Sequence, residues 1–303
     1  MARPFIGVLL TVVSLLAAFI IGSTNVEAWN RSITPHVTVG YKHIGLNLNV
    51  PSPSRDAMID LYIRDASCLT GGMGVSGQSG QLLGSVAIEA TEARDIDVIT
   101  PQNEQWSGRP LPFKWPGAGF ATWDIDGTVG WLFKQNCSPL LGLRYDCLTV
   151  AMGMPTDGAG APLIGSGVNA TFGGDLKVKT WIPYLGMKLT GQNYSALLLY
   201  SPIAATTAIT SQSGGGPGQL VDWDWAINGT GSFAELDMSY SIISGTNIQC
   251  GIWGRFTWMR LNGPADWTGT VKLTPGPQPN QDTDECLLSR NDMSIGIQGN
   301  MRF

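Results

Sequence analysis

The sequence predicts an all-β protein, a transmembrane antiparallel β-barrel of about ten strands, with twelve strands as the alternative. The first observation is the strict alternation of the final segment, residues 293–303, in which one parity holds Met293, Ile295, Ile297, Met301 and Phe303. A strand puts alternate side chains on opposite faces, so this segment has one face suited to lipid and one polar face. It also ends on an aromatic residue, as closing strands of outer-membrane barrels do. For this segment alone, the edge strand of a soluble sandwich is the alternative.

The second observation is the composition of the chain. It contains 39 Gly, 18 Pro and 11 Trp, and only 14% of its residues are charged. This composition suits many strands joined by turns, with aromatic side chains for the two membrane interfaces. The formal net charge is −5 and no basic run is present, which argues against a nucleic-acid partner.

The third observation is that the connections alternate in length. Short turns (KQNCSP, TGQN, SGTN) interleave with long segments rich in Gly, Pro and Asp at about 101–117, 151–167, 205–225 and 262–290. Short periplasmic turns and long extracellular loops are typical of outer-membrane barrels.

The chain begins with a predicted signal peptide, residues 1–28. A basic start, an apolar run over 5–21 and small residues at Val26 and Ala28 match a cleavage site after Ala28, so residues 29–303 form the mature barrel. An uncleaved membrane anchor is the alternative. We expect export and insertion into the outer membrane of a Gram-negative bacterium.

The first hundred residues contain three predicted strand regions. Residues 37–50 and 57–64 each form a strand, and residues 82–100 form one long strand or a hairpin that turns near 91–93. The alternation slips around His43 and Ile44, which indicates a β-bulge.

The later strands are predicted at 122–133, 141–146, 175–184, 194–203, 234–242 and 248–258. In each of them apolar residues occupy one parity and polar or charged residues the other. Charges inside a narrow barrel must find partners, so we expect a charge network in the lumen. Its predicted members are Asp124, Asp126, Arg144, Lys177, Lys179, Glu235, Arg255 and Arg302.

The hairpin around 244–246 predicts which members of this network lie across from each other. A three-residue turn that keeps odd-numbered residues inward places Glu235 directly across from Arg255. If the turn takes residues 243–245 instead, Arg255 lies opposite Phe233 and remains a diagonal neighbour of Glu235.

The five cysteines form no CxxC or CxxCH motif, so no zinc, haem or other cofactor site is predicted. Cys68 and Cys286 lie in segments that closure of the barrel brings together on the extracellular side. This pair is therefore a candidate disulfide in the oxidising periplasm, although the sequence does not determine which cysteines pair.

Several segments, in order and spacing, resemble strands of the omptin family of ten-stranded outer-membrane proteases. They are WDIDGTVGWLFKQNCSPLLGLRYD, KVKTWIPYLGMKL, NYSALLLYSPI, AELDMSYSIISGTNIQCGIWGRFTW and IGIQGNMRF, and the likeness covers about 95–303. It implies the omptin fold. Omptins use an Asp-His pair after their seventh strand and an acidic pair beside a tryptophan in an earlier loop.

The omptin catalytic positions are not matched here. The corresponding segment SPIAATTAITSQSGGG has no Asp, Glu or His, and in NEQW the positions of the acidic pair hold Asn103 and Gln105, which cannot act as a general base. His36 and His43 lie on the first strand, away from such a pair. We therefore predict no catalytic residue.

Three functions follow from these patterns. The favoured one is a non-enzymatic outer-membrane barrel with a structural, surface-interaction or narrow-pore role. The alternatives are a porin for small solutes, supported by the charged lumen, and a divergent omptin-type protease using Asp222 and Asp224 in DWDW. The expected partners are outer-membrane lipid and the barrel-assembly machinery, which would contact the final strand ending at Phe303. The sequence indicates no particular extracellular or periplasmic partner.

Overall fold

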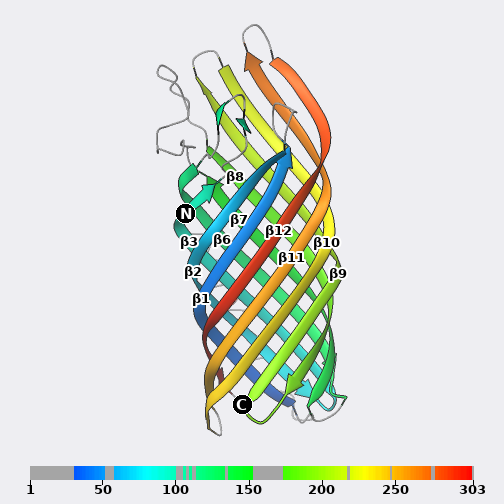
Figure 1. The fold of residues 1–303 in the computed structure, drawn as a ribbon. Coiled ribbons are helices and arrows are strands. Elements are labelled where there is room, and N and C mark those ends of the chain that lie inside the picture. Colours follow the sequence, from blue (N-terminus) through cyan, green and yellow to red (C-terminus); the bar gives the residue numbers. More distant parts are fainter. Residues whose placement is uncertain are drawn as a thin grey trace, which may run out of the picture.

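A closed barrel of ten antiparallel strands forms the protein in the computed structural model (Figure 1). The structure describes residues 31–51, 58–99, 105–106, 109–110, 114–133, 136–152, 173–216, 219–245, 248–273 and 277–301. Its strand order is β1-β12-β11-β10-β9-β8-β7-β6-β3-β2, and β4 and β5 form a separate two-stranded sheet. The predicted fold class and the ten-strand barrel are therefore confirmed. Within the described ranges, no helix is long and apolar enough to cross a membrane.

The barrel strands differ in length by up to ten residues. They are β1 (Arg31–Pro51), β2 (Met58–Ser79), β3 (Leu82–Ile99), β6 (Lys114–Trp131), β7 (Cys137–Met152), β8 (Gly173–Thr190), β9 (Tyr194–Gly216), β10 (Gln219–Ser244), β11 (Ile248–Leu273) and β12 (Pro277–Met301). The small sheet consists of β4 (Gln105–Trp106) and β5 (Arg109–Pro110). Residues 82–99 form one long strand rather than a hairpin. The predicted signal peptide, Arg302 and Phe303 lie outside the described residues.

Short turns join the strands at one end of the barrel, the lower end in Figure 1. The tightest lies between β2 and β3, where Gly80 has a φ of 59°, a left-handed conformation that glycine adopts without steric cost. At the opposite end, which we call the loop end, two predicted long loops are instead continuous strands. Gln219 pairs with Gly216, and Lys272 pairs with Pro277, so only 217–218 and 274–276 separate the strands. Loops were predicted there because the segments are rich in Gly and Pro. Neighbouring strands instead satisfy one another's backbone groups over this whole length.

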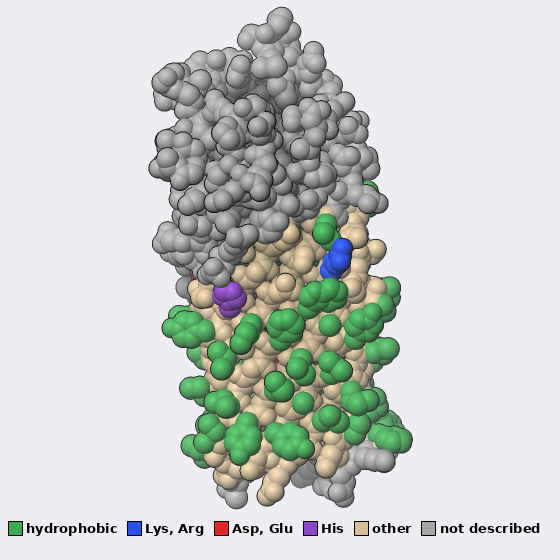
Figure 2. All heavy atoms as spheres, in the orientation of Figure 1, with side chains coloured by type: hydrophobic (Ala, Val, Ile, Leu, Met, Phe, Trp, Pro, Cys, Tyr) green, Lys and Arg blue, Asp and Glu red, His purple; other side chains and the backbone are tan. Residues whose placement is uncertain are grey.

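Exposed apolar side chains form a band on the outside of the barrel, one face of which Figure 2 shows. On β12, Met293, Ile295 and Ile297 point outward with exposed fractions of 60%, 62% and 68%, as predicted. On β11 the outward apolar residues run from Ile248 to Trp258. Ten residues rise about 33 Å along a strand, and a tilt of about 40° converts this to a band about 25 Å tall, the height of a bilayer's hydrocarbon region in outer-membrane barrels.

Inside the barrel, the half nearer the loop end holds a hydrophobic core. On β1 the apolar side chains change sides: Tyr41 is exposed on the outer surface, whereas Ile44, Leu46 and Leu48 are buried inside. The predicted bulge is present, as a register shift between Ile44 and Leu46 against β2. This core includes Ile44, Leu46, Leu48, Phe120, Leu148, Val150, Leu176, Val178, Leu261 and Leu288. The apolar parity of a strand therefore reverses where the strand leaves the outer apolar band.

Candidate functional site

A layer of inward-pointing charged side chains lies below this core, toward the short turns. We call it the lumen network. Its cationic members are Lys42, Arg144, Arg255 and Arg290, and its acidic members are Glu89, Asp124, Asp126, Asp146, Glu235, Asp237 and Asp292. Seven carboxylates face four cations, and most of these side chains are buried.

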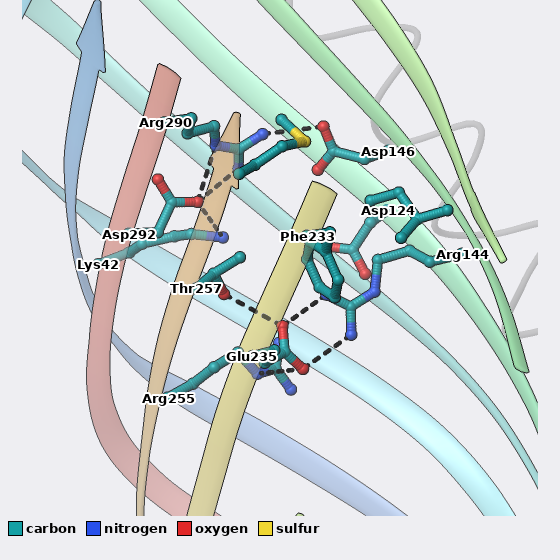
Figure 3. A pocket seen from close by; sticks show the side chains of 12 residues that line it. Lys42, Asp124, Arg144, Asp146, Phe233, Glu235, Arg255, Thr257, Arg290 and Asp292 are labelled. Carbon is teal, nitrogen blue, oxygen red and sulfur yellow. Dashed lines mark hydrogen bonds and ion pairs between the residues drawn. The ribbon is translucent and has the colours of Figure 1, made fainter. Parts of the chain in front are cut away.

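A bidentate ion pair of the lumen network joins two strands that are not neighbours in the wall. Arg144 on β7 donates two hydrogen bonds to Glu235 on β10, at 2.6 Å from Nη1 to Oε2 and 2.9 Å from Nη2 to Oε1. Strands β8 and β9 separate β7 from β10 in the wall, so this bidentate pair crosses the lumen (Figure 3). Arg144 Nε also donates to Asp126 at 2.8 Å, and the guanidinium lies 5.2 Å from the centre of the Phe233 ring.

Two further groups of contacts cross-link the wall. Arg290 on β12 reaches Asp146 on β7 at 2.8 Å. Glu89 on β3 accepts from Lys42 at 3.0 Å and from Arg255 at 2.7 Å. The ion pairs of the lumen network thus tie together seven of the ten strands, β1, β3, β6, β7, β10, β11 and β12.

The predicted register of the β10–β11 hairpin is wrong by two residues. Arg255 lies across from Asp237, and Glu235 lies across from Thr257, because the turn pairs Ser244 with Gln249 and the register shifts between Ser241 and Ile243. Arg255 still reaches Glu235 diagonally, with Nε 3.6 Å from Oε1.

Two predicted network members lie on the wrong side of the wall. Lys177 and Lys179 are exposed on the outer surface of β8, whereas Leu176 and Val178 are buried inside. The prediction assumed that apolar residues always face lipid. At the loop end of β8 they instead fill the internal core, and the lysines point outward. Arg302 lies outside the described residues.

Six network members were missing from the predicted set: Lys42, Glu89, Asp146, Asp237, Arg290 and Asp292. Parity could have found the last two, since Arg290 and Asp292 share the parity of Ser294 on the polar face of the final strand. They were overlooked because this stretch bordered a predicted loop. Lys42 and Glu89 lie in the first hundred residues, where the alternation is irregular.

The space left inside the lumen network is small. The cavity at its centre has a volume of about 20 Å³, which is enough for about one water molecule. Lower down, rings lie against glycines of the wall: a Cβ atom added at Gly142 would overlap the Tyr184 ring, and one at Gly74 would overlap the ring of His36. Tyr184 also donates a hydrogen bond to Asp126. The lumen is therefore filled by side chains at several levels.

The predicted Cys68–Cys286 disulfide is contradicted. Cys68 is a free, buried thiol inside β2, across from Lys42. Leu287, the neighbour of Cys286, lies across from Asn49. The two positions are seven residues apart along β1, about 23 Å, whereas a disulfide needs Cα atoms within about 7 Å. The prediction placed Cys68 in a loop, but the strand continues through it.

The structure places no described side chains in an omptin-like catalytic arrangement. His43 is exposed on the outer face, where Nδ1 lies 3.2 Å from Ser67 Oγ, and His36 points into the short-turn half of the lumen. Residues 201–216 belong to β9, and residues 103–104 lie outside the described part of the chain. Asp222 and Asp224 belong to β10 by their backbone, and their side chains are not described.

A closed antiparallel barrel with an apolar outer band and a charged interior defines a transmembrane β-barrel protein. Among solved structures, the chain is similar to the outer membrane protease OmpT from Escherichia coli, with a TM-score of 0.64 and 11% identity over 92% of this chain and 100% of that chain. It also matches the translocator domain of the autotransporter NalP from Neisseria meningitidis, with a TM-score of 0.41 and 8% identity over 97% of this chain and 95% of that one. No protein-family model matches the chain, and no curated protein does. The expected resemblance to omptins is confirmed for the fold, and an identity this low carries nothing about activity.

Proposed function

We propose that this chain is an integral outer-membrane protein with a closed lumen, whose structural or surface-interaction role is carried out at its loop end. The observation that carries the proposal is the filled interior. A porin keeps a water-filled path, whereas here an apolar core and the lumen network lie in series along the barrel axis.

An ion entering from the loop end would first lose its hydration in the apolar core, which costs far more than a pore can tolerate. It would then have to displace buried ion pairs such as Arg144–Glu235. Barrels with few strands are filled by their own side chains, and channels belong to wider ones. A closed barrel is therefore favoured over the porin alternative.

The apolar band and the predicted signal peptide support the outer-membrane location. A closed barrel satisfies all of its backbone groups in lipid, and the band matches the hydrocarbon thickness. The short turns would then face the periplasm and the loop end the outside.

The strands that project beyond the apolar band are the part available for surface contacts. On β11, thirteen residues, 261–273, follow Arg260, which is exposed just beyond the band. At the same tilt they rise about 30 Å above the membrane. Strands β9 to β12 pair with one another along this extension, so it forms a sheet that can present residues to a partner.

Planar-bilayer recording of the refolded protein tests the closed lumen. We expect no stepwise conductance above that of the lipid, with an open porin in the same bilayer as the control. Steady channel steps would contradict the proposal and favour a pore. An epitope inserted at 274–276 tests the surface location: antibody should label intact cells, and labelling only after permeabilisation would show the opposite orientation.

A further inference from the structure

Asp124 occupies the centre of a row of three buried carboxylates. It lies directly across from Glu89 on β3 and directly across from Asp146 on β7, and all three side chains point into the lumen. Their exposed fractions are 6%, 7% and 6% for Glu89, Asp124 and Asp146. Directly opposed residues have Cβ atoms about 5 Å apart, and like charges in this arrangement repel.

The two outer carboxylates of the row have cationic partners. Glu89 is paired with Lys42 and Arg255, and Asp146 is paired with Arg290. Asp124 differs from both: among the described residues it forms no hydrogen bond and no ion pair within 4 Å. Its side chain instead lines the water-sized cavity (Figure 3).

A buried carboxylate between two like charges is unstable unless something neutralises it. Where carboxyl groups share a confined site, one of them holds a proton. We propose that Asp124 is a proton-binding site and that the folded barrel holds it as the neutral acid at neutral pH. The bound proton makes Asp124 a hydrogen-bond donor to a neighbouring carboxylate or to a water in the cavity, and it reduces the excess negative charge of the lumen network.

A proton suits this site better than a metal cation. The charged groups that face the cavity are Lys42 on β1, Arg144 and Asp146 on β7, Glu235 on β10, Arg255 on β11, and Arg290 and Asp292 on β12, with Glu89 across from Asp124 on β3. Four of these are ammonium or guanidinium groups, which cannot serve as ligands, whereas a metal ion needs several oxygen ligands around it. In the described part of the chain, no three acidic, His or Cys side chains are arranged to hold a metal ion. A proton needs no extra volume, and the cavity offers little.

Infrared spectroscopy of Asp124→Asn in lipid vesicles tests the inference. A protonated carboxyl group gives a C=O stretching band that a carboxylate lacks, so the unmodified protein should show this band at neutral pH and Asp124→Asn should lose it. The matched control is Asp126→Asn, on the same strand and face, where the carboxylate is paired with Arg144. That variant should keep the band.

Stability gives a second readout. Asparagine has nearly the shape of the neutral acid, so Asp124→Asn should fold, keep its heat-modifiable migration on a gel, and unfold at a urea midpoint equal to or above that of the unmodified protein. Asp126→Asn should lower the midpoint. A band that persists in Asp124→Asn, a lowered midpoint, or failure of that variant to fold would each overturn the inference. These results are independent of bilayer conductance, so they are distinguishable from a failure of the proposed surface role.

Discussion

Removing the Arg144–Glu235 pair should reveal how much the closed lumen contributes to stability. The perturbation is a double-mutant cycle with Arg144→Gln, Glu235→Gln and the double variant. The pair is bidentate, with side chains only 8% and 1% exposed, so neither charge has water to replace its partner.

The structure sets the expected magnitudes. Loss of one partner from a buried pair costs about 3 to 5 kcal/mol. Here each remaining charge keeps a second contact, since Arg144 retains Asp126 at 2.8 Å and Glu235 retains Thr257 at 3.1 Å. Each single variant should therefore lose about 3 kcal/mol, and the double variant no more than either, which gives a coupling of about 3 kcal/mol or more.

Urea unfolding in lipid vesicles, followed by tryptophan fluorescence, measures the free energy of unfolding for the four proteins. The matched control is the Glu235–Arg255 cycle, because that contact is 3.6 Å and the Arg255 side chain is 22% exposed. Its coupling should be about 1 kcal/mol or less. A near-zero coupling for Arg144–Glu235 would mean that water enters the lumen and would refute the closed-lumen argument. A larger coupling for Arg255 than for Arg144 would refute the observed register.

Three further predictions test which residues face outward or inward and how tightly the interior is packed. Replacing Ile297 by Arg puts a charge near the middle of the apolar band and should cost about 2 to 4 kcal/mol of unfolding free energy, whereas Gln298→Arg on the inner face should cost much less; equal losses would mean the faces are reversed. Amine-reactive reagent should label Lys179 in the folded barrel but Lys42 only after unfolding, as mass spectrometry of the two states would show. Gly142→Ala pushes a Cβ into the tyrosine ring packed on it and should lower stability by about 1 to 3 kcal/mol in the same urea assay, whereas an unchanged midpoint would show that the ring moves freely.

The barrel was predictable because alternation is a local property of a strand. Met293, Ile295 and Ile297 share one face under any tertiary arrangement, and so do Asp124 and Asp126 on their own strand. Once one face must meet lipid, closure into a barrel follows, since only a closed sheet leaves no unpaired backbone in the membrane.

Whether a given face of a strand points outward or into the lumen depends on the whole barrel. Leu176 and Val178 alternate with Lys177 and Lys179 as cleanly as any lipid-facing strand, but their position along the barrel axis decides that the apolar residues point inward. The sequence contains no marker for the height at which the apolar band ends.

The partners in the lumen were likewise decided only by the tertiary structure. Arg144 and Glu235 are recognisable from the alternation as inward charges, but the nearest hairpin predicts Arg255 as the partner of Glu235. The bond to Arg144 joins residues 91 positions apart on strands that are not neighbours. Local pattern determines which side chains face inward, because that depends on one strand, whereas barrel diameter, stagger and register determine which of them meet, because contact across a lumen depends on all ten.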